Sequence, residues 1–220
     1  MSTSRKAAKS IAGENTKDRI LHVAVDEFAK RGFAAARIDE IARRARANKQ
    51  LIYYYFKGKA GLYDAVLEEM VEWSKPLWAS VSHSDLKQLI TTLMTNAADH
   101  KLARWRRLLA WEGIEFGARP DRRVHLESVR SAAYRTQTDV LEREKNRGAF
   151  PAEIDPKVLS LMLTLLSLGP DLLPQVTKLI TGREARDPTL RHDMQHTLLK
   201  LLDAASRRET PATSHEPQAK

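Results

Sequence analysis

Apolar residues recur at helical spacing along almost the whole chain, and this pattern predicts an all-α protein. The first strong pattern covers residues 16–31 and stops at Gly32, a residue type that commonly ends helices. Two shorter patterns, over residues 38–45 and 49–56, predict two short helices joined by a tight turn, and Asn48 is suited to cap the second one. Together they form a helix-turn-helix.

Helical spacing continues to about residue 208, and prolines and glycines interrupt it. The interruptions fall at Pro76, at residues 117–120 and 148–151, at the Gly169-Pro170 pair and at Gly182. The helices expected between them cover residues 59–79, 84–100, 102–116, 121–147, 156–168, 171–181 and 188–207. The residues that follow are polar and include two prolines, which predicts a disordered tail over residues 209–220.

These boundaries divide the chain into a disordered basic arm (1–13), a helix-turn-helix domain (14–60), a larger helical domain (61–208) and the tail. Residues 1–60 contain 14 Lys and Arg against 6 Asp and Glu, so they carry eight of the nine net positive charges. Lys and Arg that neutralise phosphates release counterions, which drives binding to polyanions. The distribution favours a polyanion-binding head on a balanced body, although Arg5, Lys6 and Lys9 also suit a solvated basic tail.

Several other classes of protein are disfavoured. The most apolar run, residues 158–168, is shorter than the roughly 18 residues of a membrane span and contains Ser and Thr. The first dozen residues do not resemble a secretory signal, and the absence of cysteine excludes disulfides and thiolate metal sites. We therefore expect a soluble, cytoplasmic protein with no membrane partner.

The sequence also lacks the common patterns of catalysis. It has no phosphate-cradling glycine loop, no nucleophile elbow and no cluster of metal ligands, so we expect neither an enzyme nor a cofactor. His192 and His196 stand four residues apart, a spacing that can place two imidazoles on one metal ion. Because no third ligand is apparent, we expect no metal site.

The second helix of the helix-turn-helix carries the residues that point to a function. Ile52 and Phe56 continue its buried face, so the opposite face is expected to meet solvent. Phenol hydroxyls and ammonium groups bind phosphate oxygens, and a glutamine reaches base edges in the major groove, which admits one helix. The residues on this outer face are Lys49, Gln50, Tyr53 and Tyr54.

Residues 16–64 resemble the N-terminal motif of the TetR/AcrR family of transcriptional regulators. The matching residues are Gly32-Phe33, the run from Ile38 to Ala42, Asn48-Lys49, the run from Leu51 to Lys59, and Leu62. The resemblance implies a homodimer whose recognition helices enter successive major grooves of a near-palindromic double-stranded DNA operator. It also implies that a small-molecule effector, bound in the helical domain over residues 61–208, releases the repressor from DNA.

The resemblance assigns roles to single residues. Asn48 would cap the recognition helix and contact a phosphate, and Lys49 and Gln50 would lie nearest to base edges. Three tyrosines would bind the DNA backbone or pack on thymine methyls, although a packing role within the protein is also open. The residues expected to bind DNA are Arg37, Asn48, Lys49, Gln50, Tyr53, Tyr54, Tyr55 and Lys59.

The sequence departs from the family pattern at two positions. Ala36 stands where threonine commonly caps the first helix of the motif, and alanine is a poor cap. Arg46 stands in the turn where glycine is usual, so a left-handed backbone there carries strain of about 1–2 kcal/mol. Arg37 is then expected to supply a phosphate contact.

Two further expectations concern the helical domain. Aromatic walls suit a flat or apolar effector, and Trp73, Trp105 and Trp111 are the candidates, with ordinary core packing as the alternative. Two apolar stripes are expected to form a dimeric four-helix bundle, or else to belong to the internal core. The stripes consist of Leu159, Met162, Leu163 and Leu166, and of Leu190, Met194, Leu198 and Leu201.

Two other hypotheses compete with the repressor. A nonspecific binder of nucleic acids or acidic surfaces would use the basic head alone and would show salt dependence without sequence preference. A helical enzyme with an accessory DNA-binding head would turn over whatever its pocket binds. Activation in place of repression also stays open, because it depends on where the operator lies relative to a promoter.

Overall fold

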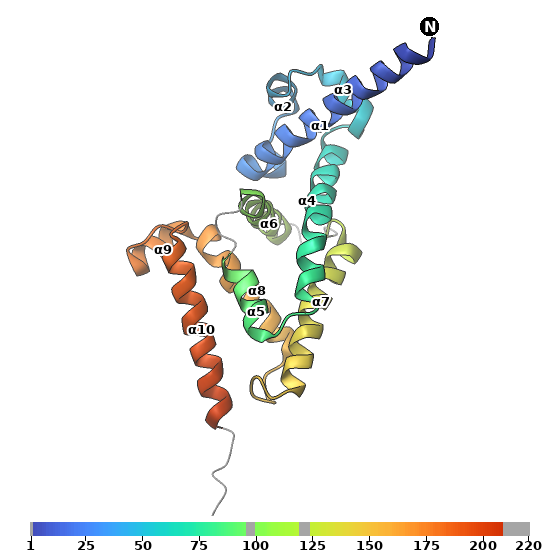
Figure 1. Ribbon diagram of the computed structural model, residues 1–220. Coiled ribbons are helices and arrows are strands. Elements are labelled where there is room, and N and C mark those ends of the chain that lie inside the picture. Colours follow the sequence, from blue (N-terminus) through green and yellow to red (C-terminus); the bar gives the residue numbers. More distant parts are fainter. Residues whose placement is uncertain (1, 96–99, 119–123, 209–220) are drawn as a thin grey trace, which may run out of the picture. The chain divides into compact units, whose positions relative to one another are not determined.

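The computed structural model describes residues 2–95, 100–118 and 124–208, with side chains for 16–94, 100–117 and 124–207 (Figure 1). These residues form helices without any strand, which confirms the all-α fold. The helices are α1 (Ser2–Ala35), α2 (Ile38–Arg44), α3 (Lys49–Phe56), α4 (Lys59–Val81), α5 (Leu86–Thr95), α6 (His100–Ala118), α7 (Glu127–Asn146), α8 (Pro156–Leu172), α9 (Pro174–Thr181) and α10 (Pro188–Arg208).

The chain divides into two compact units. Unit 1 comprises Met1–Pro76 and Asp99–Ala132, and unit 2 comprises Leu77–Ala98 and Ala133–Lys220. The expected domain boundary at residue 60 therefore differs from the structural division, because α6 packs on α1 and belongs to unit 1.

The start of the first helix corrects one expectation. The helix begins at Ser2 and not near residue 16, so residues 2–13, expected to be a disordered arm, are helical. Half of this stretch consists of Ala, Lys and Arg, which are good helix formers, and it contains no proline. Gly32 interrupts the helix as expected, with φ 72° and ψ 175°. The tail expected over 209–220 lies outside the described residues.

Two prolines expected to interrupt the helical pattern lie inside helices. Pro76 is within α4, and α8 continues past Pro170 to Leu172. A proline removes one backbone donor, and the remaining hydrogen bonds of α8 persist, including that from the Leu173 N–H to the Gly169 carbonyl at 2.9 Å. The break comes at Leu173, where φ is −126° and ψ is 60°.

A single apolar core holds unit 1 together. Ile20 and Phe28 of α1, Ile41 of α2 and Ile52 of α3 are buried side by side, and Leu108 of α6 joins them. The core fixes the positions of α2 and α3 on α1, so the residues on the outer face of α3 are carried by a rigid support.

Unit 2 has its own core. Leu89 and Ile90 of α5, Val140 and Leu141 of α7 and Leu163 of α8 pack together. The same unit buries polar groups that are hydrogen-bonded across its helices. Gln137 donates to the Ser160 carbonyl at 3.1 Å. The guanidinium of the buried Arg191 lies 2.6 Å from the Asp171 carboxylate and also donates to the Ser167 carbonyl. These bonds fix how α7, α8 and α10 pack.

No single described helix is long and apolar enough to cross a membrane. The pair α8 and α9 reaches the required length and composition only when taken together, and the two are bent by 90° where they meet. Much of α8 is occupied by core contacts of unit 2, Leu159 and Leu163 among them.

Candidate DNA-binding site

The helix-turn-helix forms as predicted, over α2 and α3. The Asn48 side chain accepts a hydrogen bond from the Gln50 N–H at 2.9 Å and so caps α3, and Lys57 ends α3 in a left-handed conformation. The N-cap of α2 is Arg37, whose side chain makes no cap hydrogen bond. Ala36, expected at the cap position, is instead buried in the core of unit 1.

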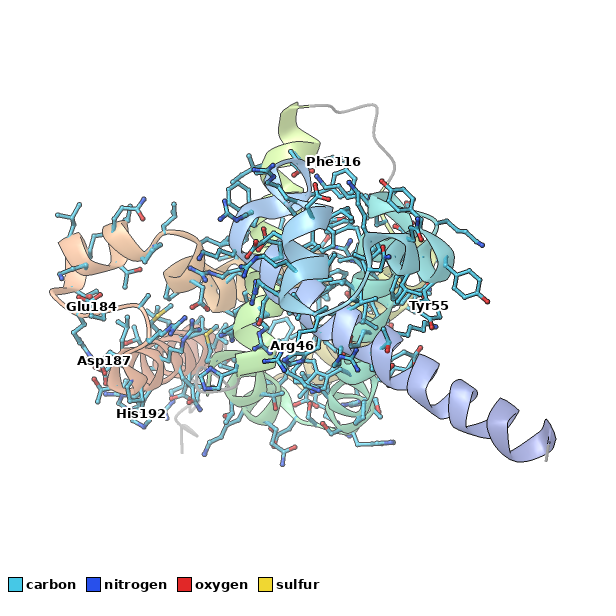
Figure 2. All side chains as sticks on the ribbon, turned by 90° about the horizontal axis from the view of Figure 1, so that it is seen from above. Arg46, Tyr55, Phe116, Glu184, Asp187 and His192 are labelled. Atoms are coloured by element: carbon cyan, nitrogen blue, oxygen red, sulfur yellow. The ribbon has the colours of Figure 1, made fainter. Side chains whose placement is uncertain are left out.

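The turn between the two helices holds Arg46 in the left-handed region, with φ 49°. The departure from glycine at this position therefore carries the strain predicted for it. The neighbouring peptide groups are held by hydrogen bonds, from the Ala47 N–H to the Ala42 carbonyl at 3.0 Å and from Arg19 Nε to the Ala45 carbonyl at 3.3 Å. Arg46 is labelled in Figure 2.

Replacing Arg46 by glycine is expected to raise the free energy of unfolding by about 1 kcal/mol, because glycine adopts the left-handed region without the Cβ clash. Urea denaturation followed by circular dichroism measures the change. The matched control is Arg43→Gly, at an exposed position inside α2, where glycine should lower stability by about the same amount. Equal destabilisation by both variants would show that the Arg46 backbone is not strained.

The outer face of α3 is polar and aromatic. Tyr54 is 71% exposed and Tyr53 is 52% exposed, while Ile52 and Phe56 are buried beneath them. Gln50 is exposed in the first turn of the same helix. Gln50, Tyr53 and Tyr54 are therefore all exposed on α3, as the sequence predicts for its outer face.

Tyr55 differs from its two neighbours. Its ring is half-buried against the core of unit 1, and its centroid lies 5.1 Å from that of Tyr54 and 6.3 Å from that of Phe56. The Tyr55 ring therefore packs edge-on against the Tyr54 ring, on the side that faces the core of unit 1. Its DNA contact stays a prediction that concerns its hydroxyl alone.

Lys49 has an acidic partner that the sequence argument did not foresee. Its Nζ lies 2.8 Å from Asp39 Oδ1, so α2 and α3 are joined by an ion pair at the surface. The hydrogen bond with Lys49 lowers the pKa of the Asp39 carboxyl, and the same bond raises the pKa of Lys49. Both groups are thus charged at neutral pH, and Lys49 must exchange this carboxylate for DNA in order to act as predicted.

Replacing Asp39 by asparagine is expected to tighten DNA binding by roughly three- to tenfold, because it releases Lys49 and removes a negative charge from the DNA-facing side. Fluorescence anisotropy with a labelled duplex measures the affinity. Glu40→Gln is the matched control, since Glu40 is paired with Arg43 on the same helix. A loss of affinity in Asp39→Asn would mean that Asp39 positions Lys49 for DNA and does not compete for it.

Lys59, the first residue of α4, is also engaged within the protein. Its Nζ donates to the Ala34 carbonyl at 3.0 Å and lies 5.0 Å from the centre of the Phe33 ring. The ammonium group is therefore held in one place at the surface of unit 1. Its phosphate contact stays a prediction.

A hollow beside the turn was missed by the sequence argument. It has a volume of about 660 Å³ and lies between α1 and the end of α2. Arginines at three positions and a histidine make it basic, with one carboxylate at its edge. Its lining residues are Asp18, Arg19, His22, Val23, Arg44, Ala45 and Arg46. The only feature of the sequence that points to it is the positive charge of residues 1–60.

The tryptophans lie in several surroundings. Trp111 of α6 packs on Gly32, where an added Cβ would lie 2.9 Å from the Trp111 ring, so only glycine fits this contact and this backbone. Trp105 contacts the core of unit 1 and stacks with the guanidinium of Arg130 at 5.6 Å. Trp73 is half-buried. These contacts match the core-packing alternative for Trp105 and Trp111, and the effector role of all three stays a prediction.

Two acidic residues of α6 have partners within unit 1. Glu112 lies 2.7 Å from Arg130, and Glu115 accepts a hydrogen bond from the Ala34 N–H at 3.1 Å. In unit 2 the rings of His192 and His196 stack at 6.4 Å, and the described residues contain no group of three that could hold a metal ion.

Comparison with known proteins agrees with this geometry. Residues 20–66 match the family model for bacterial regulatory proteins of the tetR family. The chain is 33% identical over 191 residues to the HTH-type transcriptional repressor SCO4008 of Streptomyces coelicolor, an alignment that covers 86% of this chain and 96% of the relative. It is 27% identical over 158 residues to the HTH-type transcriptional repressor NicS of Pseudomonas putida, covering 70% and 74% of the two chains.

Solved structures share the fold. SCO4942 of Streptomyces coelicolor, described as a transcriptional regulator, superposes with a TM-score of 0.62 at 25% identity, over 86% of this chain and 97% of that one. A regulator from Saccharomonospora viridis, solved in complex with choline, gives a TM-score of 0.66 at 20% identity over 88% and 96%. The chain belongs to the TetR family of helix-turn-helix transcriptional regulators.

Proposed function

We propose that the protein is a homodimeric repressor that binds a palindromic DNA operator through α3 and is released by a small-molecule effector. The observation that carries this proposal is the outer face of α3. Gln50, Tyr53 and Tyr54 are exposed on a helix whose opposite face is buried in the core of unit 1. A rigid helix that exposes these groups fits the major groove, where an amide reads base edges and hydroxyls bind phosphates.

Repression as the mode of action is supported by the relatives. SCO4008 and NicS are both named transcriptional repressors, and the first aligns with most of this chain. Operator binding by a repressor requires no chemical turnover, so the protein is proposed to be a non-enzymatic regulator that acts in the cytoplasm, where the DNA is.

A dimer is supported by the apolar surface of unit 2. Among its described residues, every exposed large apolar side chain lies on α8, α9, α10 or the residue that joins α8 to α9. Soluble monomers seldom expose contiguous apolar patches of this kind. The residues are Val158, Leu161, Met162, Leu165, Leu166, Leu173, Val176, Leu179, Ile180 and Leu201.

Each of the two apolar stripes predicted from the sequence contains both buried and exposed residues. Leu159, Leu163 and Leu190 are buried within unit 2, while Met162 and Leu201 are exposed. Along α8 the exposed positions Val158, Leu161, Met162 and Leu165 are spaced three, one and three residues apart, which forms a seam on one side of the helix. In a twofold dimer the same surface of each subunit meets its copy, so this seam would pack against the seam of the second subunit.

The effector is proposed to be a small apolar or aromatic molecule bound in the helical domain. The S. viridis relative of the same fold was solved in complex with choline, a small organic cation, which supports small-molecule binding by proteins of this architecture. The tryptophans of α4 and α6 remain the candidate wall of the site.

Selection of bound sequences from a random DNA pool at near-physiological salt tests the proposal. A dimeric repressor should enrich a palindrome with half-sites about one helical turn apart. Enrichment of no sequence, together with an affinity that follows salt concentration alone, would support the nonspecific binder. The enriched duplex then serves as the probe for effectors, and product formation from a bound effector would support the enzyme hypothesis.

A further inference from the structure

Helix α9 lies outside the core of its own subunit. None of its eight residues is buried, and Leu179 and Ile180 are 85% and 77% exposed, more than any other large apolar residue that the structure describes. Figure 1 shows α9 at the end of unit 2 where α8 ends and α10 begins, beyond the packed helices α5, α8 and α10. An isolated helix of this length is not stable in water, and α9 packs against α8 without burying any of its own residues, so a further contact that covers its apolar side chains would stabilise it.

An apolar groove lies beside this helix. It has a volume of about 520 Å³ and is formed by residues of α8, α9 and the start of α10. Its wall includes Met162, Leu166, Pro170, Ile180 and Met194, with threonines as its polar lining residues. Leu179 is on the same helix but does not line this groove, so its exposed side chain does not fill the groove of its own subunit.

Two ion pairs lie beside α9, where it turns into α10. Lys178 lies 2.6 Å from Glu184, and Arg183 lies 2.7 Å from Asp193. Figure 2 shows Glu184, Asp187 and His192 together where α9 turns into α10. The ion pairs engage the charged groups beside α9 and leave Leu179, which does not line the groove, as its most exposed apolar side chain.

We propose that α9 is an exchanged arm of the dimer, in which Leu179 of each subunit enters the α8–α9–α10 groove of the other. This inference rests on the proposed dimer. The exposed seam of α8 continues into the groove through Met162, so a partner that covers α8 also reaches the groove. If each subunit places its Leu179 in the groove of the other, the assembly is complete with two subunits. If each Leu179 instead entered the groove of a third chain, the contact would repeat and produce fibres.

A second copy of the chain fits this surface better than a small ligand does. A ligand in the groove would leave Leu179 and the α8 residues Val158 and Leu161 exposed, because none of these three lines the groove. A stable interface requires about 800 Å² from each partner. The ten exposed apolar side chains of unit 2 lie on α8, α9, α10 and the residue that joins α8 to α9, so a second copy of the chain would cover the three helices together.

Disulfide trapping tests the exchange directly, because the natural chain has no cysteine. Two full-length variants, Leu179→Cys and Met162→Cys, are purified separately, mixed to equilibrium and oxidised. Since each chain carries one cysteine, a bond between these positions can form only between different subunits. The expected result is a covalent dimer that forms at least tenfold faster than in a control mixture of Leu179→Cys with Ile114→Cys, an exposed position on α6. Equal rates of covalent dimer formation in the two mixtures would overturn the proposal that α9 is exchanged between subunits.

Leu179→Arg provides the second test, by sedimentation velocity. The variant should raise the dimer dissociation constant at least tenfold while its helical content stays unchanged, because the side chain is exposed in the subunit. Unchanged dimerisation would overturn the proposal. Sedimentation with phosphatidylglycerol vesicles identifies another occupant: vesicle binding that Leu179→Arg abolishes, with dimerisation intact, would assign α9 to a lipid surface.

The experiments distinguish an error in the exchange of α9 from an error in the proposed dimer. The variant Leu161→Arg disrupts the α8 seam alone. If it yields monomers while the cysteine mixture gives no specific bond, the dimer stands and the arm is overturned. If neither Leu161→Arg nor Leu179→Arg changes the mass of the particle, the α8–α10 dimer and its arm are both overturned.

Discussion

Replacing Leu161 by arginine is expected to convert the dimer to monomers and to weaken operator binding by about two to four orders of magnitude. Leu161 is 58% exposed in the middle of the α8 seam, so the substitution does not disturb the core of unit 2. In a symmetric dimer each substitution places two cations close together in an apolar interface. Once the subunits separate, the two heads no longer share one effective concentration at the operator, which accounts for the size of the loss.

Sedimentation velocity and fluorescence anisotropy on the selected duplex measure these two effects. Val129→Arg introduces the same charge at an exposed apolar position of α7 in unit 1 and should change neither. If Leu161→Arg stayed dimeric with full operator affinity, the dimer interface would have to lie elsewhere.

Replacing Tyr54 by alanine is expected to weaken binding to the selected operator by roughly 10- to 100-fold, about 1.4–2.8 kcal/mol. The side chain is largely exposed and contributes little to the core, so its removal should leave the circular dichroism spectrum and the unfolding midpoint nearly unchanged. The loss arises from contacts of the hydroxyl with phosphate and of the ring with thymine methyls.

Tyr54→Phe separates these two contributions, because it keeps the ring and its packing on Tyr55 and removes only the hydroxyl. An intermediate loss would assign part of the affinity to a phosphate contact. Anisotropy titrations of both variants, with Ile114→Ala as a control at an exposed site on α6, decide the assignment. Full affinity in Tyr54→Ala would remove Tyr54 from the interface.

The helix-turn-helix was predictable because its determinants are local. Asn48 caps α3, and Ile41, Ile52 and Phe56 fall on one face by helical spacing alone, so the outer face of α3 follows from the sequence. The sequence also marked Arg46, where glycine is usual, as a position at which a left-handed backbone would be strained, and its φ is 49°. The family was recognised from this same segment.

The features that sequence reasoning missed depend on contacts between distant residues. The ion pair of Lys49 with Asp39 needs the crossing of α2 and α3, and the contact of Trp111 with Gly32 joins helices nearly 80 residues apart. Periodicity cannot say which of two apolar faces meets the core, so the stripes of α8 and α10 could not be divided into buried and exposed members. The continuation of α8 past Pro170 shows that proline weakens a helix locally without fixing its end.

The most direct test of the central claim compares the selected palindrome with the same duplex after one half-site has been scrambled. Both affinities are measured at near-physiological salt and again at higher salt. A dimer that reads each half-site with one α3 should lose roughly a hundredfold or more in affinity on the scrambled duplex, and the difference should persist as salt rises. Equal affinities at every salt concentration would contradict sequence-specific recognition and would reduce unit 1 to a general polyanion-binding head.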